Sequence, residues 1–599
     1  MRIVILLLFA LSLNAQNNDQ RLAYQYYIDG DYEKAILLYE EINKKSFSLN
    51  TYNPYYVSLI NLNRFSEAEK IAKKQFSKNG TRLNFLADVI VAQYKLEQKS
   101  KYSFNLKKLL NQINGRKSQV IQIANRFQYF EMYSLALEIY EASTEKNKSQ
   151  YDLQKAQLYG LLGKDNLMIE KNIDYLLNNP NQKKIVFANI QRFVDNNGIK
   201  NKTNNQIVKK SLLSVIRLYP DRYDFNELLV WLFIQNKQYK MAVSHVISID
   251  RKTNNSIDKV YTISETLLDL EKYELAIEAL DYIISKGFNS ELYINAHINK
   301  LFALTKTLDK KEIDLEKINN SYLEVLNEVG KNSFSVLLMA NYAHFKAFYL
   351  DELNEARVIL EQAMNISGID KQDLAECKIQ YADILLLSEK IWDALLYYSQ
   401  VENDFKESPI GHKAKFKRAK IAYYQGDFNW AQAQLDVLKS STSKLISNDA
   451  MDLSLLITDN YNLDTIDAPM MMYAKADLCS FQKKYTQAIL LYDSILSTYK
   501  GHDLSDEIYF RKYEIYIQKD SMSLALNMLE SIINDYSYEI LIDDALYNSA
   551  KIYDYNFNDK EKASFYYQKI ISDHQGSIYA SQARERFRIL RGDKLNNDL

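Results

Sequence analysis

Apolar positions recur along this chain with the spacing of an α-helix, and one apolar pattern returns many times. It consists of an aromatic residue, an alanine three positions later, and a further residue, large in most copies, four positions after the alanine. Residues three or four apart share one helix face, so each copy predicts an apolar stripe. The copies are Tyr32/Ala35/Tyr39, Phe65/Ala68/Ala72, Tyr133/Ala136/Tyr140, Tyr239/Ala242/Val246, Tyr273/Ala276/Leu280, Phe428/Ala431/Leu435 and Tyr485/Ala488/Tyr492.

The copies follow a regular interval. Ala242 and Ala276 are 34 residues apart, and the interval lengthens to 37 between Ala488 and the weaker copy at Ala525. A unit of this length has room for two helices and their turns, and the alanine lets the two helices approach closely. One such pair cannot bury its apolar face alone, so we expect consecutive antiparallel pairs that stack on one another.

The content of glycine and proline supports an all-α fold. Only 14 glycines and 5 prolines occur in 599 residues. Tight hairpins and phosphate-binding loops use glycine because it adopts positive φ angles without steric cost. The sequence therefore predicts helices joined by short turns.

The repeat resembles the tetratricopeptide repeat, with Ala23 on the first helix, Gly30-Asp31-Tyr32 at the turn, and Ala35 followed by Tyr39 on the second helix. The resemblance implies a right-handed superhelical solenoid of roughly 14–15 pairs, in which the first helix of each pair lines a concave groove that binds proteins or peptides. Pairs near residues 85–110, 185–218 and 292–330 lack the pattern and are expected from the spacing alone.

The intervals also suggest domain boundaries. We expect a signal peptide over residues 1–15, a tetratricopeptide superhelix over 16–438, a joint over 439–468, and a C-terminal segment over 469–599 that ends in a capping helix. The joint is expected to hold a short apolar helix over 450–457 and a polar loop over 458–467. An ordinary insertion in a solenoid loop would also explain why the stretch over 439–468 makes the interval between neighbouring repeats longer than one unit.

The first fifteen residues have the features of an export signal. Arg2 precedes an apolar run over residues 3–13, and Leu13-Asn14-Ala15 places a small residue before a cleavage point ahead of Gln16. This run of eleven residues, in which Ser12 is the one polar residue, is too short to span a membrane, which makes an uncleaved anchor the weaker alternative. We therefore expect an exported, periplasmic protein.

Two segments of the C-terminal third are similar to bacterial envelope repeat proteins, namely the lipoprotein of the barrel-assembly machine and the coordinator of the Tol–Pal system. Residues 405–414 and 566–583 combine an aromatic-rich helix end, a turn with proline or glycine, and regularly spaced alanines. The resemblance implies partners among envelope proteins and peripheral association with the outer membrane, although the chain lacks a cysteine for lipid attachment after the signal.

No catalytic or cofactor motif was found. The sequence contains no GxGxxG, GxxxxGK[ST], HExxH, GxSxG or CxxC, and its six histidines are scattered. Cys377 and Cys479 are far apart and are expected to be small buried side chains. The formal charge of −1 gives no field that favours nucleic acid. We expect no enzyme activity, no metal and no cofactor.

One stretch is a candidate binding surface. Lys413, Phe416, Lys417 and Lys420 follow the i, i+3, i+4, i+7 spacing of one helix face. In the tetratricopeptide resemblance this face would project into the groove, where it could bind an acidic peptide or a terminal carboxylate. A solvated helix face with extended lysine stems is the alternative.

Taken together, the sequence predicts a non-catalytic scaffold that binds partner proteins or peptides. A glycan- or peptidoglycan-binding module is a second hypothesis, because the 47 tyrosines could form stacking platforms. An accessory subunit of an envelope enzyme is a third.

Overall fold

The computed structural model describes residues 19–45, 47–113, 116–147, 150–195, 201–288, 292–307, 312–440, 443–462 and 466–593. Within these ranges the chain is helical, and no strand occurs. The chain divides into two compact units, here called unit 1 (Met1–Leu232) and unit 2 (Phe233–Leu599). The predicted signal peptide lies outside the described residues.

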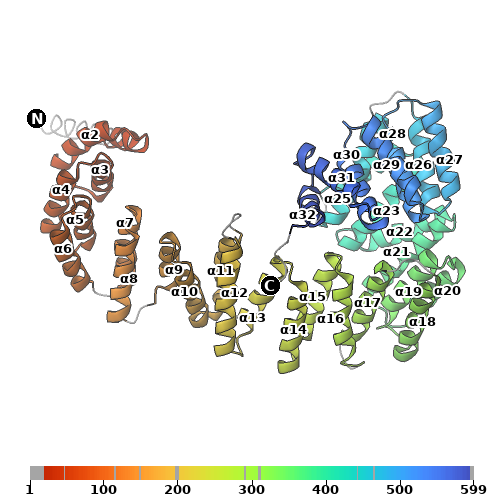
Figure 1. The fold of residues 1–599 in the computed structure, drawn as a ribbon, viewed down its shortest axis with the longest axis horizontal. Helices are drawn as coiled ribbons and strands as arrows, with labels where there is room; N and C mark the ends of the chain where they lie inside the picture. Colours follow the sequence, from red (N-terminus) through yellow and green to blue (C-terminus); the bar gives the residue numbers. More distant parts are fainter. Residues whose placement is uncertain are drawn as a thin grey trace, which may run out of the picture. The chain divides into compact units, whose positions relative to one another are not determined.

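Unit 1 is a series of short helices that pack in the order of the sequence (Figure 1). A helical stretch over residues 19–28 comes first. It is followed by α2 (Tyr32–Lys45), α3 (Leu49–Asn61), α4 (Phe65–Lys78), α5 (Leu83–Lys95), α6 (Lys99–Gln112), α7 (Lys117–Tyr129), α8 (Tyr133–Asn147), α9 (Asp152–Leu161), α10 (Asp165–Asn178), η1 (Pro180–Gln182), α11 (Lys183–Val194) and α12 (Asn201–Leu218). Helix α13 (Tyr223–Gln235) carries the boundary between the units.

Unit 2 continues the same arrangement. Its helices are α14 (Tyr239–Thr253), α15 (Ile257–Asp269), α16 (Tyr273–Ile284), α17 (Tyr293–Thr307), α18 (Glu312–Val329), α19 (Val336–Tyr349), α20 (Leu353–Met364), α21 (Lys371–Leu387), α22 (Ile391–Asp404), α23 (Pro409–Tyr424), α24 (Phe428–Leu438), α25 (Lys444–Ile457), α26 (Ala468–Phe481), α27 (Tyr485–Thr498), α28 (Ser505–Gln518), α29 (Met522–Asp535), α30 (Ile542–Lys551), α31 (Lys560–Asp573) and α32 (Ala580–Leu590). Two π-helical turns, η2 (Thr458–Asn462) and η3 (Ile552–Asn556), extend α25 and α30.

This order confirms the predicted all-α solenoid of helix pairs. The pairs expected from spacing alone are present as α5/α6, α11/α12 and α17/α18. Cys377 and Cys479 are buried, as expected.

The residues of the repeat pattern lie at the contacts between helices. All seven alanines have no exposed surface, and they are Ala35, Ala68, Ala136, Ala242, Ala276, Ala431 and Ala488. Where the residue four positions after the alanine is a tyrosine, that tyrosine is buried, as Tyr39, Tyr140 and Tyr492 are. The leading aromatic residue Phe428 is buried as well. The leading tyrosines Tyr32, Tyr133, Tyr273 and Tyr485 are half-buried. The alanine thus marks the closest approach of two helices, and the rings close the space beside it.

Two alanines, Ala136 on α8 and Ala431 on α24, illustrate what this position does in each unit. Each lies in the first turn of the second helix of its pair, and its backbone N–H donates to the carbonyl of the residue before the helix. The acceptors are Met132 at 3.1 Å and Asp427 at 3.0 Å. Ala136 belongs to the apolar core of unit 1 and Ala431 to that of unit 2. Both side chains therefore serve packing between helices, and neither presents a surface to a partner.

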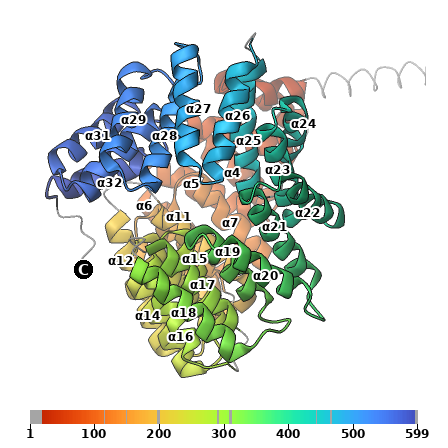
Figure 2. The same ribbon diagram turned by 90° about the vertical axis from the view of Figure 1, so that its right-hand side faces the viewer.

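The segment predicted as a joint lies inside unit 2, and its helix is longer than expected. Helix α25 begins at Lys444 and not at Ala450, because Ile446 and Leu453 extend the apolar stripe through Ala450 and pack against the core. The predicted loop is helical as far as Asn462. Helix α25 packs against α24 and α23, and α26 then returns to α23, as Figure 2 shows. Helix α25 is therefore a single helix added between two pairs.

Unit 2 also has contacts between segments far apart in the sequence. The turn between α26 and α27 reaches the ends of α19 and α21: Lys483 Nζ donates to the Phe348 carbonyl at 3.1 Å, and Gln482 Nε2 donates to the Leu386 carbonyl at 3.0 Å. Lys484 forms an ion pair with Glu389 at 2.6 Å. These bonds connect the turn between α26 and α27 to helices that are not its neighbours in the sequence.

Candidate functional site

The predicted basic stripe lies on α23, and two of its lysines have acidic partners. Lys413 Nζ is 2.8 Å from Glu376 Oε1, and Lys417 Nζ is 2.9 Å from Asp383 Oδ1, both on α21. Lys420 Nζ lies 5.6 Å from the centre of the Tyr424 ring. Phe416 is half-buried and packs against the core. The stripe is thus largely neutralised within unit 2, and its role in binding stays a prediction.

A better candidate is a groove in unit 1 on the first helices of three consecutive pairs. It has a volume of 680 Å³, within the range of ligand-binding pockets. Its lining comes from α3, α5, α7 and the residues that precede α5 and α7, and comprises Leu49, Tyr52, Asn53, Thr81, Arg82, Leu83, Asn84, Phe85, Asp88, Arg116, Ser118, Gln119, Gln122, Asn125, Arg126 and Tyr129. We call it the unit-1 groove.

The floor of the unit-1 groove is built around a buried carboxylate. The Asp88 side chain is 2% exposed and accepts hydrogen bonds from Arg126 Nε at 2.5 Å and from Tyr52 Oη at 2.9 Å. Burial raises the pKa of the Asp88 carboxyl, while Arg126 and Tyr52 act in the opposite direction. The Arg126 guanidinium also lies 5.1 Å from the centre of the Tyr56 ring. This network joins α3, α5 and α7 and fixes the position of Arg126.

Two polar atoms of the groove are buried and have no hydrogen-bond partner among the described residues. They are Nη2 of Arg126, a donor, and Oε1 of Gln119, an acceptor. Leaving a buried polar group unpaired costs about 1–3 kcal/mol, so a partner that reaches these atoms after a small movement of the two side chains would recover that energy. The two residues lie seven positions apart on α7, which is two helical turns, or about 10 Å. An extended peptide spans this distance in about three residues.

The rim of the unit-1 groove is polar and positively charged. Asn53, Asn84, Gln122 and Asn125 present amide groups, and all four residues are exposed, on α3, α5 and α7. Three arginines line the groove, whereas Asp88 is the one acidic residue in its described lining. Amides can donate to and accept from a peptide backbone, and the arginines favour a segment with acidic side chains.

Sequence reasoning did not identify this groove. The repeat pattern follows the second helix of each pair, whereas the groove lies on first helices, on which polar residues line it beside a separate apolar face. A signal was present on α7: Gln119, Gln122, Arg126 and Tyr129 follow the i, i+3, i+7, i+10 spacing of one polar face. The contribution of α3 and α5 could not be read from that spacing, because it depends on how the pairs stack.

In the part of the chain that the structure describes, no group of three or more histidine, cysteine, aspartate or glutamate side chains is arranged to hold a metal ion. Among the same residues, none of the helices has the length and apolar character needed to span a membrane.

Comparisons with known proteins find likeness only among solved structures. No protein-family model and no curated protein matches the sequence. The chain is similar to a chain in the structure of Naa15/Naa10 bound to HypK-THB, with 13% identity over 98% of both chains and a TM-score of 0.29. It is similar to yeast Tom70, with 13% identity over 96% of this chain and 99% of Tom70 and a TM-score of 0.24. A tetratricopeptide repeat protein from Parabacteroides merdae aligns over 50% of this chain and 98% of its own, with 13% identity and a TM-score of 0.21.

Proposed function

We propose that this protein is a non-catalytic scaffold that binds an extended segment of a partner protein in the unit-1 groove. The observation that carries the proposal is the pair of unpartnered polar atoms on α7, Gln119 Oε1 and Arg126 Nη2. The two residues are about 10 Å apart along the axis of α7, and an extended peptide spans that length in about three residues. The apolar floor formed by Tyr52, Leu83 and Phe85 would take one apolar side chain of the same segment.

The distribution of tyrosines favours this function over glycan binding. A stacking platform needs exposed rings, but the bulkiest fully buried side chains of the described residues are mainly tyrosines. They include Tyr39, Tyr52, Tyr140, Tyr398 and Tyr492. These rings fill the spaces between helices, which is a structural role.

We also propose that the protein is exported and acts in the bacterial envelope. The support is Arg2 with the apolar run over residues 3–13, and the envelope-type segments at 405–414 and 566–583. The test is fractionation of cells that express the full chain, followed by mass determination of the protein's N-terminus. We expect a protein that begins at Gln16 in the periplasmic fraction. An uncut protein in the cytoplasm would contradict this proposal.

Site-specific photo-crosslinking tests the groove. A photoreactive amino acid replaces Asn125, an exposed residue at the rim, and in a matched control it replaces Lys107, an exposed residue on α6 outside the groove. We expect Asn125 to form adducts with one segment of a partner polypeptide, identified by mass spectrometry, and Lys107 to form none with that segment.

A second substitution links the adduct to the proposed contact. Gln119→Met keeps the length of the side chain but removes the acceptor, so the loss of one hydrogen bond should reduce the adduct about fivefold. The proposal is wrong if both photoreactive positions give the same adducts, or if Gln119→Met leaves the yield at Asn125 unchanged.

A further inference from the structure

Unit 2 contains a second pocket whose lining differs from that of the unit-1 groove. It lies on α26, α28 and α30, with contributions from the start of α27 and the turn before α32, and its volume is 570 Å³. Five aromatic rings line it: Phe481, Tyr485, Phe510, Tyr513 and Tyr579. All five are half-buried, so their faces or edges are within reach of a ligand. We call it the aromatic pocket.

The charged groups of the aromatic pocket are acidic. Glu514 and Asp544 line it, and no lysine or arginine does so among the described residues. Tyr579 Oη donates to Asp544 Oδ1 at 2.6 Å, and Arg511 Nη1 donates to Glu514 Oε2 at 2.8 Å. These bonds use one oxygen of each carboxylate, Asp544 Oδ1 and Glu514 Oε2. Burial and these two carboxylates raise the pKa of Tyr513 to about 12, which places the ring within the field of both.

We propose that the aromatic pocket binds the cationic side chain of a partner polypeptide, an arginine or a lysine. Aromatic faces attract a cation through their quadrupole, and arginine also stacks on them. The carboxylates of Glu514 and Asp544 supply charge-assisted hydrogen bonds for the same group. A neutral sugar could stack on the same rings and donate hydroxyl hydrogen bonds to the carboxylates, but it carries no charge for them to attract. This site goes beyond the proposed function of unit 1, because its ligand has the opposite charge.

The test uses the full chain and three synthetic hexapeptides, Ac-GRGRGG-NH2, Ac-GQGQGG-NH2 and Ac-GEGEGG-NH2, with binding followed by saturation-transfer NMR. We expect the arginine peptide to bind and the other two not to. The double variant Glu514→Gln/Asp544→Asn keeps the shape of the pocket and should weaken the binding of the arginine peptide at least about tenfold. A thermal melt checks that the variant is folded.

Salt provides a measurement that needs no variant. Raising sodium chloride from low concentration to about 0.5 M should weaken the binding of the arginine peptide severalfold, because partly exposed charges are screened. The proposal is overturned if the neutral peptide binds equally, if the folded double variant binds as well as the natural chain, or if chitotriose displaces the arginine peptide. Gln119→Met in the unit-1 groove should not affect this binding, so the two proposals fail separately.

Discussion

The backbone around Gly411 leaves no room for a side chain. It lies in the first turn of α23, after the cap formed by Ser408, whose Oγ accepts a hydrogen bond from the Gly411 N–H at 3.3 Å. A Cβ added at Gly411 would lie 1.8 Å from the carbonyl oxygen of Phe405. Because the obstacle is backbone, the turn between α22 and α23 has to move before any side chain fits.

We predict that Gly411→Ala lowers the free energy of unfolding of this region by about 1–3 kcal/mol, the usual cost of overpacking. The matched control is Gly576→Ala in the corresponding turn before α32, where an added Cβ meets no atom within 4 Å. Hydrogen exchange of α22 and α23 gives the local stability. Equal effects of the two substitutions would show that the close approach at Gly411 is not as described.

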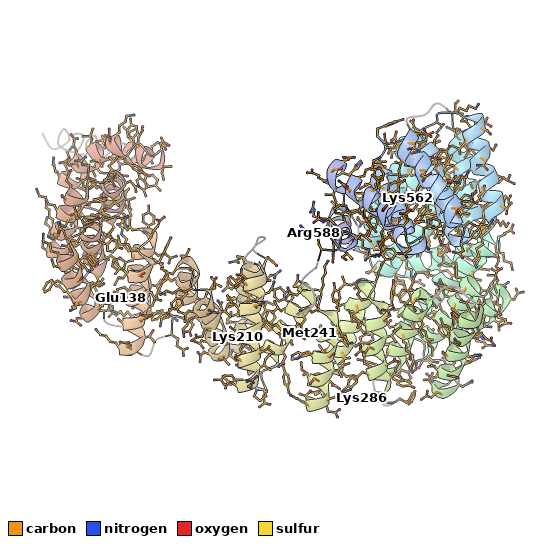
Figure 3. The ribbon with its side chains drawn as sticks, in the orientation of Figure 1. Glu138, Lys210, Met241, Lys286, Lys562 and Arg588 are labelled. Carbon is orange, nitrogen blue, oxygen red and sulfur yellow. The ribbon has the colours of Figure 1, made fainter. Side chains whose placement is uncertain are left out.

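Asp250 is a buried carboxylate that joins two neighbouring pairs. It is 2% exposed on α14 and accepts hydrogen bonds from the Ser256 N–H at 2.8 Å and from Tyr282 Oη at 2.8 Å. Lys286, labelled in Figure 3, lies 2.9 Å from the same carboxylate. Burial alone would raise the pKa of Asp250, but these three donors together lower it.

The lowered pKa predicts how stability depends on pH. Aspartate in the unfolded chain has a pKa of about 3.9, and the pKa of Asp250 in the folded protein is lower than its ordinary value. The stabilisation is therefore fully present above the unfolded pKa. It is lost as the pH falls through the folded pKa. We expect Asp250→Asn to cost about 1–3 kcal/mol at pH 7 and progressively less below about pH 4. Chemical unfolding at several pH values measures this, and a pH-independent difference would contradict the assignment.

Residues of the apolar pattern could be placed from the sequence, whereas the partners of buried charges could not. The helical period fixes which face Ala276 occupies, and that face is buried. The bond between Asp250 and Tyr282 joins residues 32 positions apart on different pairs. It depends on the stacking of neighbouring pairs, on which the pattern within one helix gives no information.

At the level of elements, unit 2 repeats one polar motif between successive pairs. An aspartate on a first helix or its π-helical extension accepts a hydrogen bond from the tyrosine four positions after an alanine of the second helix, namely Ala394, Ala488 or Ala563. The same aspartate forms an ion pair with a basic residue on the next first helix. The tyrosine lies 13 or 15 residues after the aspartate in the sequence. The basic residue lies 32 or 34 residues after the aspartate. The sets are Asp383/Tyr398/Lys417, Asp477/Tyr492/Arg511 and Asp554/Tyr567/Arg586.

This motif gives the repeat tyrosine a second role that can be tested. Tyr398 Oη donates to Asp383 at 2.5 Å, so we expect Tyr398→Phe to destabilise α21–α23 by about 1.5–3 kcal/mol, the range for a bond to a charged group. Tyr39 occupies the same repeat position, but its buried hydroxyl has no hydrogen-bond partner among the described residues. Tyr39→Phe should therefore be neutral or slightly stabilising.

Hydrogen exchange of α21–α23 and of α2–α3 measures the two local stabilities. If Tyr398→Phe and Tyr39→Phe lower the local stability by a similar amount, the two tyrosines act through packing alone.

The elements themselves were predictable because the apolar period repeats in each pair. The length of α25 was not, because Ile446 falls outside the repeat pattern and was placed in the part of the joint that precedes the expected helix over 450–457. The basic stripe on α23 was correctly placed on one helix, but the acidic residues that neutralise it, Glu376 and Asp383, lie on α21. The net charge of a surface depends on ion pairs between different helices. The sequence of one helix does not show these pairs.

For the whole molecule, the near-zero net charge conceals two sites of opposite character. The unit-1 groove carries three arginines and one aspartate, whereas the aromatic pocket of unit 2 carries two carboxylates and no base among its described lining residues. A chain with these two sites suits a scaffold that engages an acidic segment in one unit and a basic segment in the other.

If a partner segment lies in the unit-1 groove, it contacts the first helices of three pairs. Hydrogen–deuterium exchange of the full chain is compared without the segment that crosslinks at Asn125 and at saturation with it. We expect slower exchange within α3, α5 and α7 when the segment is bound. Slower exchange confined to α4, α6 and α8, with α3, α5 and α7 unchanged, would show that the segment binds elsewhere.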